Sequence, residues 1–173
     1  MKIQFTLALL GLSTFFANAA ELLQTYPSSG VEIHATDNVL KLDAEGPNIR
    51  FFLKDQEMFV TAFVFKDTRN PYPLLSDFSK QFLNSVYSRS TYKIFFEEKV
   101  ENNFANKKSD GIEYLIDLVD EKCELLLANS VGNQTYIFIN ISNEVTSANC
   151  DSFGNKLNSV AAQITASITI KNI

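Results

Sequence analysis

The sequence has few of the residue patterns from which enzyme active sites are built. It contains one histidine and two cysteines, and it has no Cys-x-x-Cys pair, no Gly-x-Ser-x-Gly elbow and no glycine-rich phosphate loop. A Ser-His-Asp or Cys-His arrangement would have to use His34, which lies in a short predicted strand. We therefore interpret His34 as a strand residue without a catalytic role, and we expect neither a catalytic constellation nor a cofactor.

Calcium loops of the Asp-x-Asp-x-Asp-Gly type are also missing. Four carboxylates do gather near the middle of the chain, at Asp117, Asp120, Glu121 and Glu124, and oxygen ligands of this kind could hold a hard cation. We interpret them as solvated side chains around a turn and predict no metal site. A hydrolase that uses two of these carboxylates is kept as a second alternative for the function.

Positive charge is scarce as well. Fifteen Lys and Arg residues against 20 Asp and Glu residues give a formal net charge of −5, and such a chain repels the phosphate backbone of nucleic acids. We therefore expect no nucleic-acid partner. The longest apolar run, from Phe5 to Phe16, is interrupted by Ser13 and Thr14 and is too short for a typical membrane-spanning helix.

That apolar run is typical of a secretory signal peptide instead. Lys2 precedes it, and Ala17-Asn18-Ala19 behind it is a small-residue cleavage site. We predict that residues 1–19 are removed and that residues 20–173 form one exported domain, in the periplasm or outside the cell. Cys123 and Cys150 both lie in this part, where oxidising conditions favour a disulfide between them.

The pattern of apolar residues predicts hairpins, a helix, a run of four strands and a final helix. Hairpins are expected over residues 31–42 and 49–65, and the strand 58–65 is apolar on both faces and should be central. The four strands are expected at 92–100, 112–119, 123–128 and 135–141, with a polar turn over 101–111. The predicted fold is therefore α+β, an antiparallel sheet with two packed helices.

Helical spacing places the first helix between Ser76 and about Ser90, with Ser76 and Asp77 as caps. The last helix should begin near Asp151 or Ser152, directly after Cys150, so that the disulfide ties its start to the sheet. Its apolar stripe is expected to comprise Phe153, Leu157, Val160, Ile164 and Ile168.

This order of elements resembles the PsbP-like fold, which also includes small bacterial periplasmic proteins of the DcrB type. The resemblance covers roughly residues 31–168 and rests on the central strand 58–65, the helix near 78–88 and the terminal helix. It implies an α/β sandwich. It implies no active-site residue, because members of one fold differ in function.

One face of the predicted sheet is rich in aromatic residues, opposite to the face that carries Val60, Ile94 and Ile137. A helix on each face of the sheet would bury these aromatic residues, whereas two helices on the same face would leave them as an exposed patch. The proline-containing loop 67–73, with Arg69 and Tyr72, could then rim the patch. The aromatic residues are Phe59, Phe63 and Phe65 on one strand, Phe95 on another, and Tyr136 and Phe138 on a third.

We therefore expect an exported, non-catalytic binding or accessory protein. It would contact a protein partner through the aromatic sheet face or through the loop 67–73. A carrier of a small apolar or lipid-like ligand is the first alternative.

Overall fold

The computed structural model of the chain describes residues 22–34, 39–45, 47–68, 73–87, 92–118, 122–132, 134–143 and 150–171. The predicted signal peptide, Arg69, Tyr72, Asp120 and Glu121 lie outside these residues. Within them the elements are β1 (Leu22–Tyr26), β2 (Val31–His34), β3 (Val39–Glu45), β4 (Asn48–Leu53), β5 (Met58–Lys66), α1 (Leu75–Val86), β6 (Tyr92–Asn103), β7 (Lys108–Leu118), β8 (Lys122–Ser130), β9 (Thr135–Asn143), α2 (Cys150–Ala166) and β10 (Ile168–Ile170).

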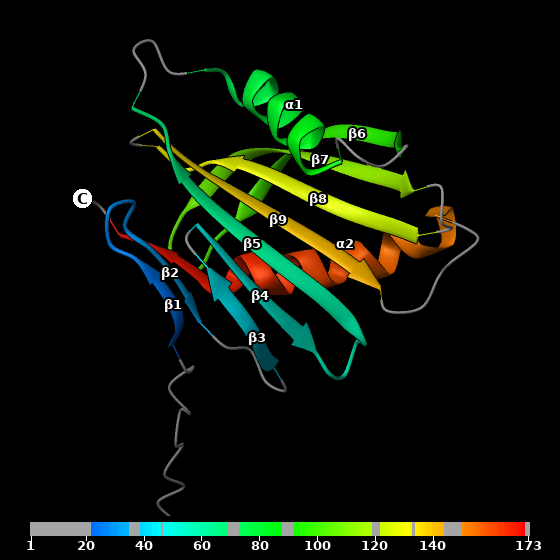
Figure 1. Ribbon diagram of the computed structural model, residues 1–173, viewed down its shortest axis with the longest axis horizontal. Coiled ribbons are helices and arrows are strands. Elements are labelled where there is room, and N and C mark those ends of the chain that lie inside the picture. Colours follow the sequence, from blue (N-terminus) through cyan, green and yellow to red (C-terminus); the bar gives the residue numbers. More distant parts are fainter. Residues whose placement is uncertain are drawn as a thin grey trace, which may run out of the picture.

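The main layer of the fold is a seven-stranded sheet with the order β3-β4-β5-β9-β8-β7-β6 (Figure 1). Every neighbouring pair of strands is antiparallel, as expected. β5 lies inside the sheet between β4 and β9, which agrees with its apolar residues on both faces. β1, β2 and β10 form a separate three-stranded sheet that the sequence pattern did not indicate. The expected hairpin over residues 31–42 is therefore wrong, because β2 pairs with β1 and β10, whereas β3 pairs with β4.

The two helices lie on opposite faces of the seven-stranded sheet (Figure 1). α2 packs Leu157, Val160 and Ile164 into the cluster that contains Val60 and Ile139. α1 buries Phe82 and Leu83 in a second cluster with Tyr114 and Phe138. Because successive strand residues face opposite sides, β5 and β9 each contribute to both clusters.

The start of α1 differs from the expectation that Ser76 and Asp77 cap it. The helix begins one residue earlier, no side chain caps it, and the backbone N–H groups of Asp77 and Phe78 donate to the carbonyl oxygen of Leu74. Asp77 lies in the first turn, where its negative charge favours the positive end of the helix dipole. The helix ends at Val86 rather than near Ser90.

The expected polar turn over residues 101–111 is mostly strand. β6 continues to Asn103 and β7 begins at Lys108, and these two residues face each other in the register. Polar residues can continue a strand here because most of their side chains are exposed at the sheet edge. An ion pair of 2.6 Å between Lys108 Nζ and Glu101 Oε1 spans the hairpin.

The end of α2 also differs from expectation, because Ile168 is not part of the helix. The helix ends at Ala166, and Ile168 begins β10, which pairs with β2 opposite Ile33. Ile168 is still buried in the cluster that α2 joins. Its apolar character reflects burial in a strand, which helical spacing alone cannot distinguish from burial in a helix.

A disulfide joins Cys123 in β8 to Cys150, the first residue of α2, with the two Cα atoms 5.5 Å apart. The predicted pairing is therefore present in the structure. It closes a stretch with a sequence separation of 27 and attaches the beginning of α2 to the sheet.

Candidate functional site

Four of the six aromatic residues expected on one sheet face lie beneath α1. The rings of Phe82 and Phe138 stack with centroids 4.2 Å apart, and Phe63 meets Phe82 at 5.1 Å. Phe65 and Tyr136 join the same cluster, with Tyr136 4.4 Å from the ring of Phe78. The structure thus shows the arrangement with one helix on each face, in which these four side chains belong to the interior.

Phe95 does not join them. A β-bulge interrupts the pairing between Ile94 and Phe96, and Phe95 is the extra, exposed residue. The expected position of Ile94 is also wrong because of this bulge. Ile94 pairs with Ile116, which belongs to the cluster beneath α1. Ile94 therefore lies on the α1 side of the sheet and not on the opposite face.

Phe59 lies on the α1 side too, but beyond the end of the helix. α1 meets β5 at Phe63 and Phe65, whereas Phe59 faces Phe52 of β4 with ring centroids 4.9 Å apart. The Cζ atom of Arg50 lies 4.9 Å from the centroid of the Phe59 ring, a cation–π contact. Both phenylalanines are half-buried and Arg50 is exposed.

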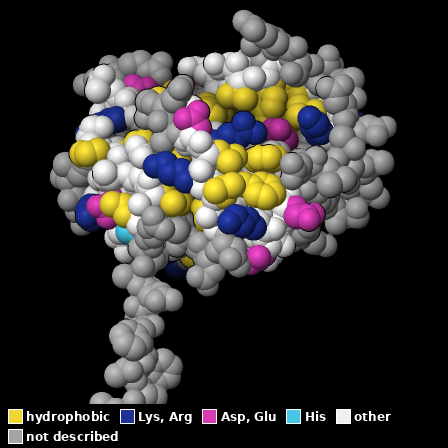
Figure 2. All heavy atoms as spheres, turned by 60° about the horizontal axis from the view of Figure 1, so that its bottom comes forward, with side chains coloured by type: hydrophobic (Ala, Val, Ile, Leu, Met, Phe, Trp, Pro, Cys, Tyr) yellow, Lys and Arg dark blue, Asp and Glu magenta, His cyan; other side chains and the backbone are white. Residues whose placement is uncertain are grey.

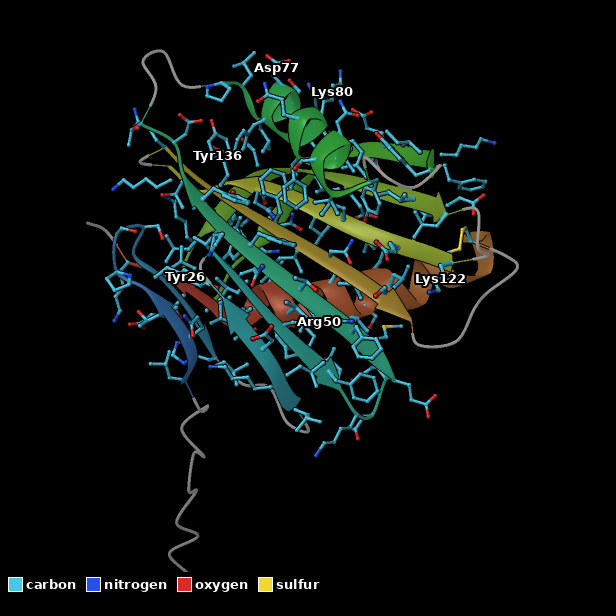
Figure 3. The ribbon with its side chains drawn as sticks, in the orientation of Figure 1. Tyr26, Arg50, Asp77, Lys80, Lys122 and Tyr136 are labelled. Atoms are coloured by element: carbon cyan, nitrogen blue, oxygen red, sulfur yellow. A yellow bond between two sulfur atoms is a disulfide. The ribbon has the colours of Figure 1, made fainter. Side chains whose placement is uncertain are left out.

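These residues form an open apolar surface at one end of the sheet. Leu40 of β3 faces Phe52 and is 46% exposed. We call Leu40, Arg50, Phe52 and Phe59 the β3–β5 face. Figure 2 shows hydrophobic side chains gathered across the face of β3 to β5 with Lys and Arg side chains among them. Figure 3 shows Arg50 well apart from α1, whereas Tyr136 lies near the start of that helix.

A polar cluster lies between this surface and the end of α1. Tyr87, which follows the last residue of α1, donates a hydrogen bond of 2.5 Å to Glu124 Oε2. Asn140 Nδ2 donates a hydrogen bond of 2.7 Å to the same Glu124 oxygen. It also donates to the hydroxyl oxygen of Tyr87 at 2.7 Å. Glu124 and Asn140 come from the neighbouring strands β8 and β9.

The environment of Tyr87 keeps its hydroxyl protonated. Burial raises the pKa of Tyr87 far above its ordinary value, and the nearby charge of Glu124 raises it further. A tyrosine in this state acts as a hydrogen-bond donor and not as a base. The cluster therefore holds the end of α1 on the sheet, and Glu124 is a structural acceptor rather than the solvated carboxylate that we expected.

The other candidate groups for chemistry do not come together. Asp117 and Glu124 lie on opposite faces of the sheet, because Asp117 is adjacent in β7 to Ile116, which pairs with Glu124. His34 Nε2 lies 3.7 Å from Glu32 Oε2 in the small sheet. In the part of the chain that the structure describes, no group of three His, Cys, Asp or Glu side chains could hold a metal ion.

The β3–β5 face was only partly visible in the sequence. Phe59 was expected on the aromatic face, but Leu40, Arg50 and Phe52 were missed. The signal was present in β4, where Arg50 and Phe52 alternate with the buried Ile49, Phe51 and Leu53. What the alternation could not indicate is how far α1 extends over the sheet.

Among the described helices, none is long and apolar enough to cross a membrane.

Comparison with known proteins gives a fold but no closer relationship. No protein-family model and no curated protein matches the chain. The solution structure of cyanobacterial PsbP (CyanoP) from Synechocystis superposes with a TM-score of 0.59 at 13% identity, over 90% of this chain and 96% of that chain.

Two crystal structures match less well. One, from Bacteroides thetaiotaomicron, has a TM-score of 0.47 at 10% identity over 83% of this chain and 46% of that chain. The other, Pseudomonas aeruginosa PA94, a protein of unknown function, has a TM-score of 0.43 at 10% identity over 89% and 98%. From the similarity to cyanobacterial PsbP, the chain has a PsbP-like fold.

Proposed function

We propose that this protein is an exported, non-catalytic accessory protein that binds another protein through the β3–β5 face. The observation that carries the proposal is the exposed apolar group around Phe52 and Phe59, with Arg50 held over the Phe59 ring. α1 meets β5 at Phe63 and Phe65, whereas Phe59 meets Phe52 of β4. α2 lies on the opposite face of the sheet.

The composition of the face supports a protein partner. Aromatic residues and arginine are enriched among the residues that contribute most to protein–protein binding, and their apolar surroundings exclude water from the contact. The ring of Phe59 restricts the guanidinium of Arg50 before a partner arrives, which lowers the entropy lost on binding. A partner with an apolar side chain beside a carboxylate would satisfy both features of the face.

Export is the second part of the proposal. The predicted signal peptide motivates it, and the disulfide between Cys123 and Cys150 is compatible with an oxidising compartment. The partner would then be met in the periplasm or outside the cell.

A carrier of an apolar ligand remains the first alternative. The aromatic side chains beneath α1 could line a site for such a ligand, but their ring centroids lie only 4.2 to 5.9 Å apart. A ligand that bound among these rings would therefore have to separate α1 from the sheet. Native mass spectrometry of protein purified from its own cells distinguishes the two functions. A bound small molecule of constant mass favours the carrier, and protein without added mass counts against it.

Photo-crosslinking in the source cells tests the protein-binding proposal. A photoreactive phenylalanine analogue replaces Phe52 in one strain and the exposed Lys93, on the far edge strand β6, in a control strain. We expect one discrete protein adduct from position 52 and none of the same mass from position 93. The absence of an adduct at position 52, or the same adducts at both positions, contradicts the proposal.

A further inference from the structure

The strand β6 is an edge of the seven-stranded sheet, at the opposite side from the β3–β5 face. It runs from Tyr92 to Asn103 and pairs with β7 on one side only. Among the described residues, no other strand pairs with its outer side. An edge strand of this length offers backbone N–H and C=O groups to a further strand.

The second half of β6 is regular. Beyond the bulge at Phe95, residues 96–103 pair one to one with residues of β7. Glu97, Lys99 and Glu101 therefore alternate on one face of the sheet, and Glu98, Val100 and Asn102 alternate on the other. A regular segment of this kind can accept a new strand without the local twist that a bulge imposes.

We propose that two copies of this protein associate through β6, with the two strands antiparallel and centred on Val100. In this register Lys99 faces Glu101 of the second copy, and Glu101 faces Lys99 of the second copy. Val100 faces its own counterpart, and Glu98 and Glu97 face the amides of Asn102 and Asn103. The two sheets become continuous, with both α1 helices on the same side.

The charges select this register over its neighbours. Centring the strands on Glu98 opposes two Glu98 side chains, and centring them on Glu101 opposes two Glu101 side chains. Centring them on Lys99 opposes two lysines and also places Glu97 against Glu101. Like charges directly opposite each other destabilise a strand pair, whereas opposite charges stabilise it. Only centring on Val100 places opposite charges face to face without a facing pair of like charges.

Charged residues on an edge strand commonly prevent such pairing. In β6, however, the lysine of one copy would face a glutamate of the other copy. Lys99 is exposed and has no ion-pair partner among the described residues. Glu101 is held at the surface by Lys108 at 2.6 Å, so that Lys99 of the second copy would add a second cation to the same carboxylate. This association is independent of the proposed binding at the β3–β5 face.

Charge exchange tests the association. Sedimentation velocity of the purified full chain, at concentrations from about 1 to 200 µM, gives the dissociation constant of the dimer for the parent protein and for Lys99→Glu, Glu101→Lys and the double variant. Each single substitution creates two facing pairs of like charge, and we expect it to weaken dimerisation about tenfold or more. The double substitution restores opposite charges, and we expect it to restore dimerisation.

Lys93→Glu is the matched control. It changes the net charge as Lys99→Glu does but lies before the bulge, outside the regular segment, and we expect it to leave the dissociation constant within about threefold of the parent value. Circular dichroism confirms that each variant is folded. A parent protein that stays monomeric throughout this concentration range overturns the proposal, as does a double variant that dimerises no better than the single variants.

Discussion

Asn140 of β9 donates a hydrogen bond of 2.7 Å to Glu124 Oε2 of β8, the same oxygen to which Tyr87 donates at 2.5 Å. Two strands and the end of α1 thus meet at one carboxylate oxygen. The contact marks where α1 stops covering the sheet, and Phe59 and Phe52 lie beyond it. The extent of the β3–β5 face therefore depends on this cluster.

Removal of the Tyr87 hydroxyl should loosen the end of α1. Tyr87→Phe leaves Glu124 Oε2 with one donor in a partly buried place, and we expect the free energy of unfolding to fall by about 1 to 3 kcal/mol. Urea denaturation measures this free energy of unfolding. Tyr92→Phe is the control, because the Tyr92 hydroxyl bonds to Asn84 in an exposed position and its loss should cost less than about 0.5 kcal/mol. Equal losses in the two variants contradict the role of the cluster.

Removal of the Tyr26 hydroxyl should have the opposite effect. This oxygen is buried without a hydrogen-bond partner among the described residues, so Tyr26→Phe removes a desolvation cost and should leave stability unchanged or raise it by about 1 kcal/mol. Burial also raises the pKa of Tyr26 from 10.0 to about 12. The native state then holds this proton more firmly than the unfolded state.

The stability linked to Tyr26 is consequently complete below pH 10 and is lost as the pH rises through about 12. Tyr26→Phe lacks this contribution. We expect the free energy of unfolding to fall less steeply in the variant than in the parent protein between these pH values. Parallel urea titrations at pH 9 and pH 11 measure the difference, and identical slopes would refute the assignment.

Glu113 should make stability depend on pH in the acidic range. Burial and then the charge of Glu98, directly opposite on β6, raise the pKa of Glu113. The contribution of Glu113 to stability is complete below the ordinary glutamate pKa of 4.5 and is lost as the pH rises through the raised pKa of the native state. Glu113→Gln should therefore be more stable than the parent protein at pH 7 and equal to it at pH 3. A variant that is less stable at pH 7 contradicts this.

The disulfide should contribute to stability through the length of chain that it closes. With a separation of 27 residues, the chain-entropy relation gives about 3.5 kcal/mol. The double substitution of Cys123 and Cys150 by serine should lower the free energy of unfolding by about that amount in urea denaturation. A loss below about 1 kcal/mol would mean that the two sites are held together by other contacts.

Much of the fold could be predicted from local patterns. The alternation in β9 and the apolar residues on both faces of β5 predicted the antiparallel pairs that these strands form. The two cysteines predicted the disulfide that links β8 to α2. The small sheet was missed because β10 is three residues long, too short to show a period. Ile168 was assigned to the helix for the same reason.

The candidate site was harder to predict, because it depends on where α1 lies. The alternation of residues along the strand places Phe59, Phe63 and Phe65 on one face of the sheet. It does not distinguish which of the three a helix covers. The structure separates them, since α1 covers Phe63 and Phe65 and ends before Phe59. The polar cluster brings together Tyr87, Glu124 and Asn140, residues up to 53 positions apart, and no local pattern connects them.

The affinity for the partner found by crosslinking at position 52 tests the central claim most directly. Isothermal titration compares the parent protein with Phe52→Ser, Arg50→Glu and a control, Lys122→Glu, an exposed residue on β8. Residues at the centre of an interface contribute about 2 kcal/mol or more, so we expect the first two variants to bind roughly 30-fold more weakly. The control should bind within about threefold of the parent protein. Affinities that are unchanged in both Phe52→Ser and Arg50→Glu would contradict binding through the β3–β5 face.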